Sequence, residues 1–199
     1  MGKNSCVILF AKLPILGLAK TRIAKSVGKK RAFEIYKELL GVTSEILEGF
    51  DYYVFYAGGD SSSLIEPYFH NALDFIKQSN GDLGVKLKAS FNLIYSKGYK
   101  NIVCVGSDSP YVTSFDISNS ITFLEEGADV VLGPADDGGY YLVGCKENSL
   151  NIFDVDSWSS SDLMNDTLKI ITACNLSAKL LESKSDIDTI EDYIKYKSF

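Results

Sequence analysis

The stretch ILFAKLPILGLAKTRIA, residues 8–24, joins the first strand-like run of this 199-residue chain to a basic loop. The run CVILF at 6–10 is continuously apolar, as expected for a strand buried on both faces of a parallel sheet. The whole protein is acidic, with a net charge of -6. Cations that gather in one loop of such a protein predict a site for an anion such as a phosphate. The notable residues of the loop are Lys12, Gly17, Lys20, Thr21 and Arg22.

This loop resembles a P-loop but lacks its defining pattern. G-x-x-x-x-G-K-[ST] requires Gly directly before Lys, whereas Ala19 precedes Lys20. The pattern G-x-G-x-x-G is also missing, because Gly17 stands alone. Two interpretations stay open. Lys20 and Arg22 bind a di- or triphosphate with help from the Thr21 hydroxyl, or they are solvated residues that open a helix.

The composition predicts one well-packed domain spanning residues 1–199, with 46% hydrophobic and 23% charged residues. The acidic balance argues against nonspecific binding of nucleic acid or membranes, which need broad basic surfaces. The four cysteines form no C-x-x-C pair and three lie in apolar runs, so we expect reduced core residues in a cytoplasmic protein. The N-terminal apolar run is too short for a membrane span and lacks a signal-peptide pattern.

Strand-like runs alternate with helical periodicity along most of the chain. The predicted strands are 6–10, 52–57, 72–78, 101–106, 129–134, 140–145 and 178–182. The predicted helices are 29–47, 62–69, 81–98, 115–126, 162–175 and 189–197. This alternation predicts an α/β three-layer sandwich with a mainly parallel central sheet. The connection between 129–134 and 140–145 is too short for a crossover helix, which favours an irregular or antiparallel pair there. Residues 146–161 lack periodicity and are expected to form a long loop.

Ligands of open α/β sheets bind beyond the carboxyl ends of the strands, so polar residues in those loops are the first candidates. In GSDSP at 106–110, Asp108 follows a buried strand and is well placed to hold a divalent cation. The alternative is a carboxylate that only caps the next helix. Ser114 is the better candidate for that cap, because Pro110 separates Asp108 from the helix.

The segment GPADDGGYYLVG at 133–144 has two interpretations. Asp137-Gly138 is a strong hairpin signal, so the segment suits an ordinary turn between strands. Yet Asp136 and Asp137 after a buried strand also suit a metal or a sugar hydroxyl, and Gly138 and Gly139 allow a ligand to approach the backbone closely.

The late segment SDIDTIED at 185–192 offers two more carboxylates. Asp186 and Asp188 alternate, so an extended backbone would place both on one face. Asp188 is also a candidate N-cap for the last helix, with Glu191 completing a capping-box pattern, and this role can coexist with metal binding. His70 is the only histidine, which argues against a metal site built from several histidines and against most Ser-His-Asp triads. Cations for phosphates and carboxylates for Mg²⁺ or Mn²⁺ suit a transferase acting on a nucleotide.

Taken together, AKLPILGLAKTR, QSNGDLGVKL, GSDSP, GPADDGGYYLVG, WSSSD and DIDTIED resemble one family in their order along the chain. This family is the bacterial glycosyltransferase-like proteins often labelled arsenosugar-biosynthesis glycosyltransferases. They are related to 2-phospholactate guanylyltransferases and share the nucleotide-diphospho-sugar transferase fold. The resemblance spans Phe10 to Asp192.

The resemblance implies a role for each matching position. The phosphate-contacting loop would comprise Lys12, Gly17, Lys20, Thr21 and Arg22, and the segment approaching the base would comprise Gln78, Gly81 and Asp82. The metal would be held by Asp108 and by Asp188 with Asp186 nearby. Asp136, Asp137, Gly138 and Gly139 would border the acceptor pocket, and Asp108, Asp137 and Lys20 would take part in catalysis.

These features predict a metal-dependent transferase that uses a nucleotide-activated sugar and a small-molecule acceptor, with Mg²⁺ or Mn²⁺ as cofactor. A nucleotidyltransferase that releases pyrophosphate is an alternative, because Ser107-Asp108-Ser109-Pro110 lacks the Asp-x-Asp usual in glycosyltransferases of this fold. A nonenzymatic sugar-nucleotide sensor is a third. Tyr193 and Tyr196 would serve either a homodimer or a terminal helix packed on the core.

Overall fold

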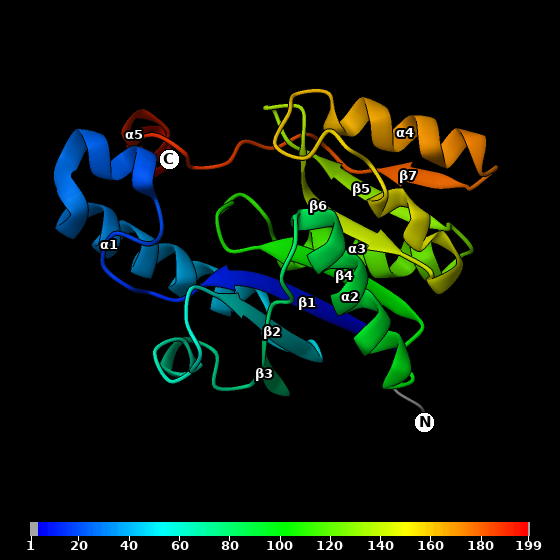
Figure 1. The fold of residues 1–199 in the computed structure, drawn as a ribbon, viewed down its shortest axis with the longest axis horizontal. Coiled ribbons are helices and arrows are strands. Elements are labelled where there is room, and N and C mark those ends of the chain that lie inside the picture. The colour runs from blue at the N-terminus through cyan, green and yellow to red at the C-terminus, as the bar shows by residue number, and fades with distance from the viewer. Residues whose placement is uncertain (1–3, 199) are drawn as a thin grey trace.

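The computed structural model describes residues 4–198 and is built around one seven-stranded sheet with the order β3-β2-β1-β4-β6-β5-β7 (Figure 1). The strands are β1 Ser5–Lys12, β2 Tyr52–Ala57, β3 Asp74–Lys77, β4 Asn101–Gly106, β5 Val130–Pro134, β6 Tyr140–Cys145 and β7 Ala178–Leu180. β6 is antiparallel to both of its neighbours, and the other strand pairs are parallel. The prediction of a mainly parallel sheet is therefore confirmed, and the pair at 129–145, expected to be irregular or antiparallel, is antiparallel. The antiparallel pairing of β6 with β4 was not predicted.

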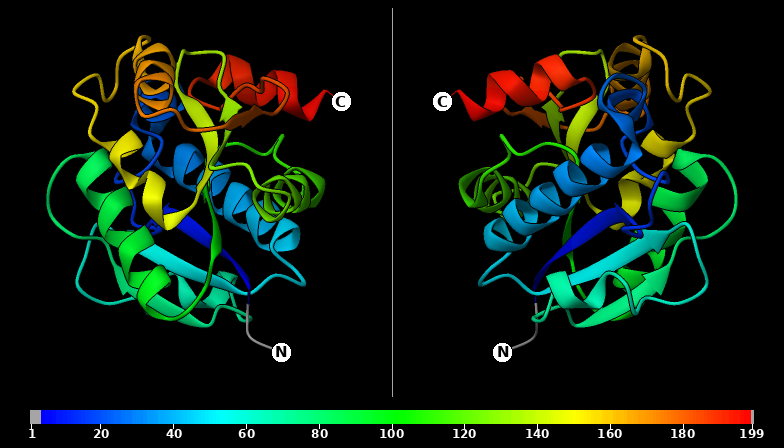
Figure 2. Two further views of the ribbon diagram at one scale, coloured as in Figure 1. Left: turned by 90° about the vertical axis from the view of Figure 1, so that its right-hand side faces the viewer. Right: turned by 90° about the vertical axis from the view of Figure 1, so that its left-hand side faces the viewer.

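Helices cover both faces of this sheet, which gives the predicted three layers (Figure 2). The helices are α1 Thr21–Ile46, α2 Leu83–Ser96, α3 Ser114–Glu125, α4 Leu163–Ala173 and α5 Ile190–Lys197, with short 3₁₀ helices η1 Glu66–Tyr68 and η2 Glu147–Phe153. Successive side chains of β1 point to opposite faces: Val7 and Leu9 pack in the core beneath α1 and α3, and Cys6 and Ile8 pack in the core beneath α2, η2 and α4. Both faces of β1 are thus buried, as its unbroken apolar run indicated.

Three predicted segments differ from the structure, and the helix expected at 62–69 is only the short 3₁₀ helix η1. α1 begins at Thr21, not near residue 29, and is kinked at Gly28, whose φ of 82° and ψ of 159° lie outside the helical region. The sequence predicts the helix only from residue 29 because Gly28 interrupts the helical periodicity. The expected loop at 146–161 contains η2, whose Leu150, Ile152 and Phe153 are buried against α2.

The N-caps of α3 and α5 also differ from the predicted ones. Thr113, not Ser114, caps α3 and forms a capping box with Asp116. Thr189, not Asp188, caps α5 and forms the same box with Asp192. In each case the threonine accepts from the backbone N–H three residues later while the acid accepts from the threonine N–H, which satisfies two otherwise free donors.

The carboxyl ends of six strands, together with the first residue of β6, lie at one edge of the sheet. The loops after β1, β4 and β5 and the segment after β7 therefore converge, as predicted. Within residues 4–198, no helix is both long and apolar enough to cross a membrane.

Candidate active site

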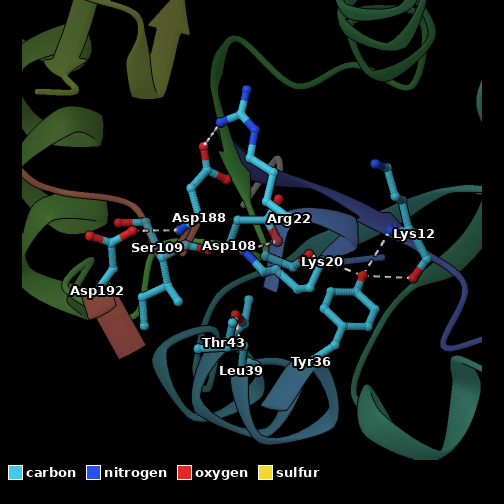
Figure 3. A network of polar contacts seen from close by, with 12 residues as sticks. Lys12, Lys20, Arg22, Tyr36, Leu39, Thr43, Asp108, Ser109, Asp188 and Asp192 are labelled. Atoms are coloured by element: carbon cyan, nitrogen blue, oxygen red, sulfur yellow. Dashed lines mark hydrogen bonds and ion pairs between the residues drawn. The ribbon is translucent and has the colours of Figure 1, made fainter. Parts of the chain in front are cut away.

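Lys20 forms the centre of the polar network at this edge (Figure 3). Its ammonium lies 2.9 Å from Asp108 Oδ1 and donates to the Ile187 carbonyl at 2.6 Å, and its side chain is only 4% exposed. The backbone of Lys20 is left-handed, with φ 52° and ψ 44°, at the N-cap of α1. Such a conformation costs a non-glycine residue on the order of 1 kcal/mol and concentrates at functional sites. Here it directs a cation from the first loop at the acid after β4.

A second pair repeats this arrangement nearer the solvent. Arg22 Nη1 lies 2.5 Å from Asp188 Oδ2, and both side chains are at least half exposed. The first loop and the late segment after β7 are thus joined by two contacts, one from Lys20 to Ile187 and one from Arg22 to Asp188 (Figure 3). Residues far apart in sequence meet here because both segments leave the same edge of the sheet.

Asp186 is a third carboxylate at this edge and lies close enough to Asp108 to feel its charge. Burial, and then the negative charge of Asp108, raise its pKa to about 6, whereas a hydrogen bond with Ser109 and the charge of Lys20 act in the opposite direction. Ser109 also donates to the Ser185 carbonyl at 3.1 Å, which fastens the late segment to the loop after β4. A buried carboxylate beside a second one is a favourable environment for a cation.

The carboxylates suit a magnesium or manganese ion that is shared with a substrate. Across residues 4–198, no three acidic, cysteine or histidine side chains are gathered as a complete metal site. Mg²⁺ is commonly held by only one or two protein carboxylates together with substrate phosphates. Asp108, whose side chain is 56% exposed, and Asp188 offer oxygens of this kind. The residues present therefore fit such an ion.

The other predicted residues of the first loop lie around this network. Lys12 ends β1 with its side chain exposed, while its backbone N–H and C=O are both hydrogen-bonded to the Tyr36 hydroxyl, at 2.9 and 2.7 Å. Thr21 is the exposed first residue of α1, and Gly17 adopts a φ of 85° that favours glycine. Tyr36 is a residue that the sequence analysis missed, because its position on a helix suggested only a core role.

The predicted base-binding segment has its side chains already engaged. Gln78 donates its amide to the Phe55 carbonyl at 2.9 Å. Asp82 is the N-cap of α2 and accepts from the Val85 N–H at 2.9 Å, as the predicted helix start required. Gly81 has a φ of 117°. These contacts fix the shape of the segment, and whether it contacts a base stays a prediction.

The four residues of the predicted acceptor pocket lie in the turn between β5 and β6 and are also bonded within the chain. Asp136 accepts from the hydroxyls of Ser183 at 2.7 Å and Ser185 at 2.5 Å, and these bonds lower its pKa. Asp137 is exposed and accepts from the Gly139 N–H at 2.9 Å. A Cβ on Gly138 would lie 2.1 Å from the Ser161 carbonyl oxygen, so the close approach at this glycine is to the chain itself.

A cavity of about 230 Å³ opens next to Asp108 and was not anticipated as a site. Its walls come from the end of β1, the first turns of α2, the end of β4 and most of β6. From the segments that the sequence singled out, the cavity is lined by Asp108, Ser109 and Asp186. Asp136 and Asp137 do not line it. Sequence patterns identified the apolar liners only as core residues, since periodicity does not distinguish a filled core from a hollow one.

Comparison with known proteins agrees with this architecture. Residues 44–160 match a family model described as an uncharacterized protein conserved in bacteria (DUF2064). The chain belongs to the DUF2064 family. The matched part of this DUF2064 protein contains Asp108 and the β5–β6 turn, whereas Lys20, Arg22, Asp186 and Asp188 lie outside it. No protein of curated function matches the chain.

Solved structures identify the fold. A crystal structure from Desulfovibrio desulfuricans G20, described provisionally as a nucleotide-diphospho-sugar transferase, is 27% identical with a TM-score of 0.89, covering 99% of this chain and 88% of that one. A cytidylyltransferase from Leptospira borgpetersenii is 14% identical with a TM-score of 0.63, covering 99% and 86% of the two chains. Rv0371c from Mycobacterium tuberculosis H37Rv, solved with manganese, is 13% identical with a TM-score of 0.59, covering 100% of each chain. The DUF2064 chain therefore has the nucleotide-diphospho-sugar transferase fold.

Proposed function

We propose that this protein is a metal-dependent transferase that uses a nucleotide-activated sugar as donor. The observation that carries this proposal is the pairing of two loop cations, Lys20 and Arg22, with two strand-end carboxylates, Asp108 and Asp188. The 27% identity with the D. desulfuricans protein over nearly the whole chain supports the same class of substrate.

The two ion pairs explain how such a donor would be recognised. A diphosphate bound at this edge would attract Lys20 and Arg22, whose ammonium and guanidinium groups suit phosphate oxygens. Their partners Asp108 and Asp188, with Asp186 beside them, would then hold Mg²⁺ or Mn²⁺. An ion held by these residues would neutralise the charge that develops on the leaving diphosphate. Before substrate binds, the pairs Lys20–Asp108 and Arg22–Asp188 neutralise these charges within the protein.

The transfer step follows from this placement. An acceptor hydroxyl oxygen forms a bond to the anomeric carbon of the sugar, and the bond from that carbon to the diphosphate oxygen breaks. We assign the proton of the hydroxyl to the exposed Asp137 carboxylate, which does not line the cavity next to Asp108 but lies close enough to Asp186 for its charge to help raise the pKa of that residue. The nucleoside diphosphate leaves. Lys20 stabilises the negative charge on the departing phosphates, as preorganised cations do in transferases. Gly138 and Gly139 hold the turn that carries Asp137.

A nucleotidyltransferase is the second candidate, and one sequence observation favours it. Only one acid follows β4, in Ser107-Asp108-Ser109-Pro110. An acceptor phosphate would then attack the α-phosphate of a nucleoside triphosphate, and pyrophosphate would leave. The resemblance to arsenosugar-biosynthesis glycosyltransferases supports the first candidate, and the relationship to 2-phospholactate guanylyltransferases supports the second.

Thermal shifts of the full chain test the proposal. We expect sugar nucleotides to raise the melting temperature when Mg²⁺ or Mn²⁺ is present, because a ligand that binds only the folded state stabilises it. The metal-dependent shift should vanish in Asp108→Asn and persist in the control Asp166→Asn, whose partly exposed side chain pairs with Lys169 on α4. A shift only with triphosphates, followed by pyrophosphate release, would transfer the assignment to the second candidate. If no nucleotide shifts the melting temperature, both candidates fail.

A further inference from the structure

The cavity beside Asp108 is separate from the cations of the first loop, which are not among its lining residues. Phe10, at the end of β1, is its only liner from residues 8–24, and Lys12, Lys20 and Arg22 do not reach it. Asp108 contacts Lys20 and also lines the cavity. A group bound in the cavity would therefore sit next to the proposed diphosphate site without occupying it.

The charges around the cavity are of one sign. Its charged liners are Asp108 and Asp186, and within the part of the chain that the structure describes no lysine, arginine or histidine lines it. The nearest cation, Lys20, is committed to Asp108 and the Ile187 carbonyl. Without a bound divalent cation, a phosphate or carboxylate placed here would face two carboxylates, and like charges in such a site repel strongly.

The remaining walls are apolar and define a small space. Leu83 and Leu87 from α2, with Leu142 and Val143 from β6, form its sides. The volume of about 230 Å³ lies below the range of roughly 300 to 1,000 Å³ that is typical of sites for drug-sized ligands. A ligand of one ring, or of a short branched chain, suits this size. Leu83 is 43% exposed at the start of α2, which leaves an apolar surface open to a ligand.

The shape of the cavity is fixed by tight packing behind it. A Cβ on the buried Gly84 would lie 2.4 Å from the Phe153 carbonyl oxygen and 2.5 Å from Trp158 Nε1. The first turn of α2 is therefore pressed against η2 and the following loop. The Trp158 ring in turn meets the cavity-lining Tyr140 edge-on, with ring centroids 6.2 Å apart. A wall held in this way cannot easily open to admit a larger or charged group.

We propose that this cavity binds the acceptor, and that the acceptor is an uncharged hydroxyl compound with a small apolar body. The proposal rests on the proposed function for what the bound compound does, but its binding can be measured without any nucleotide. It predicts that the cavity rejects phosphorylated analogues, which the nucleotidyltransferase candidate would require as acceptors.

A matched pair of probes tests this binding on the full chain. 2-Phenylethanol and phenyl phosphate share a ring and differ in charge, and ligand-observed NMR in the absence of divalent metal reports the affinity of each, because a bound Mg²⁺ would itself attract the phosphate. We expect 2-phenylethanol to bind at least tenfold more tightly than phenyl phosphate. Equal or preferential binding of phenyl phosphate, or no binding of the alcohol, would overturn the proposal. Displacement of the alcohol by free cytidine or uridine would overturn it too, because the cavity would then belong to the nucleoside.

Two lysine substitutions on the same helix locate the binding. Leu83→Lys places a cation at the cavity wall and should reduce the preference for the alcohol at least fivefold. Leu93→Lys, near the other end of α2 at a site that is 38% exposed and outside the cavity, should leave the preference unchanged. Equal effects of the two substitutions would show that the probes bind elsewhere. These outcomes are separate from the thermal shifts with nucleotides, so either proposal can fail without the other.

Discussion

Lys20 shows how a single residue can hold a site ready for its ligands. Its ammonium sits where it compensates Asp108 and opposes the repulsion between Asp108 and Asp186. The same ammonium is the cation that a substrate phosphate would attract. Binding of metal and nucleotide would therefore be linked, because each ligand releases a group that the other one needs.

Replacing Lys20 should separate these two affinities. In Lys20→Met, Asp108 loses its internal cation, so we expect Mn²⁺ alone to bind a few-fold more tightly by calorimetry. Binding of the metal–nucleotide complex should weaken at least tenfold, since a charge-assisted hydrogen bond is worth about 1.5–3 kcal/mol. Lys25→Met, an exposed cation one turn further along α1, is the matched control and should change neither affinity. A loss of both affinities in Lys20→Met would contradict the exchange of partners.

At the scale of elements, the strand edge depends on how the segment after β7 is fastened. Lys184 donates to Asp116 in α3 and to the Tyr111 carbonyl, the latter at 2.9 Å. Asp116 also accepts from the Thr113 N–H and hydroxyl, both at 2.7 Å. Burial by itself would raise the pKa of Asp116, but the bonds from Lys184 and Thr113 outweigh it and lower the pKa. This one carboxylate caps a helix and anchors the segment that carries Asp186 and Asp188.

The lowered pKa fixes the pH dependence of this anchor. A carboxyl whose pKa is lower in the folded state contributes its stability above its unfolded pKa of about 3.9, and loses it as the pH falls through the folded value. Asp116→Asn should therefore reduce the free energy of unfolding by about 1–3 kcal/mol at neutral pH. The difference should shrink at more acidic pH. Urea unfolding at several pH values measures it, and Asp156→Asn, at an exposed position in the loop after η2, is the control. A pH-independent difference would contradict the electrostatic cause.

At the scale of the whole molecule, the candidate site is assembled from both ends of the chain. α5 packs on α1 in a small cluster that contains Ile23, Leu39 and Ile187. In that cluster Tyr193 is 5% exposed, and its hydroxyl donates to Glu38 at 2.6 Å. Tyr196 meets Tyr111 edge-on, with ring centroids 5.5 Å apart. Both tyrosines thus pack within the chain, which supports the core-facing interpretation of the terminal helix.

Truncating Tyr193 should therefore affect a site that it does not touch. Tyr193→Ala removes a buried ring and should lower the free energy of unfolding by about 2–4 kcal/mol. It should also weaken nucleotide binding, because α5 holds the segment with Ile187 and Asp188 against α1. Ile194→Ala, 58% exposed on the same helix, should leave both quantities nearly unchanged. Unfolding in denaturant and calorimetric titration measure the two effects. Normal nucleotide affinity in a destabilised Tyr193→Ala would separate the site from the docking of α5.

The sequence by itself determined the order of the elements and therefore the fold. Unbroken apolar runs such as 6–10 and 102–105 are characteristic of strands buried on both faces, and they alternate with helical periods. It also identified Lys20, Arg22, Asp108, Asp186 and Asp188 as candidates, because cations gather in the loop after the first strand, Asp108 follows a buried strand and the two late acids alternate. Capping positions were less reliable, since Thr113 and Thr189 differ from the predicted caps by one residue and neighbouring side chains decide between them.

Only the tertiary structure decided which candidates meet. Pairing of Lys20 with Asp108 and of Arg22 with Asp188 depends on the left-handed turn at Lys20 and on the path of the segment after β7. The cavity beside Asp108 could not be predicted from the sequence either, because apolar residues that line a cavity follow the same sequence pattern as those that fill the core. Local propensity is encoded in neighbouring residues, whereas the two ion pairs join segments more than 80 residues apart, and the cavity depends on how several elements pack together.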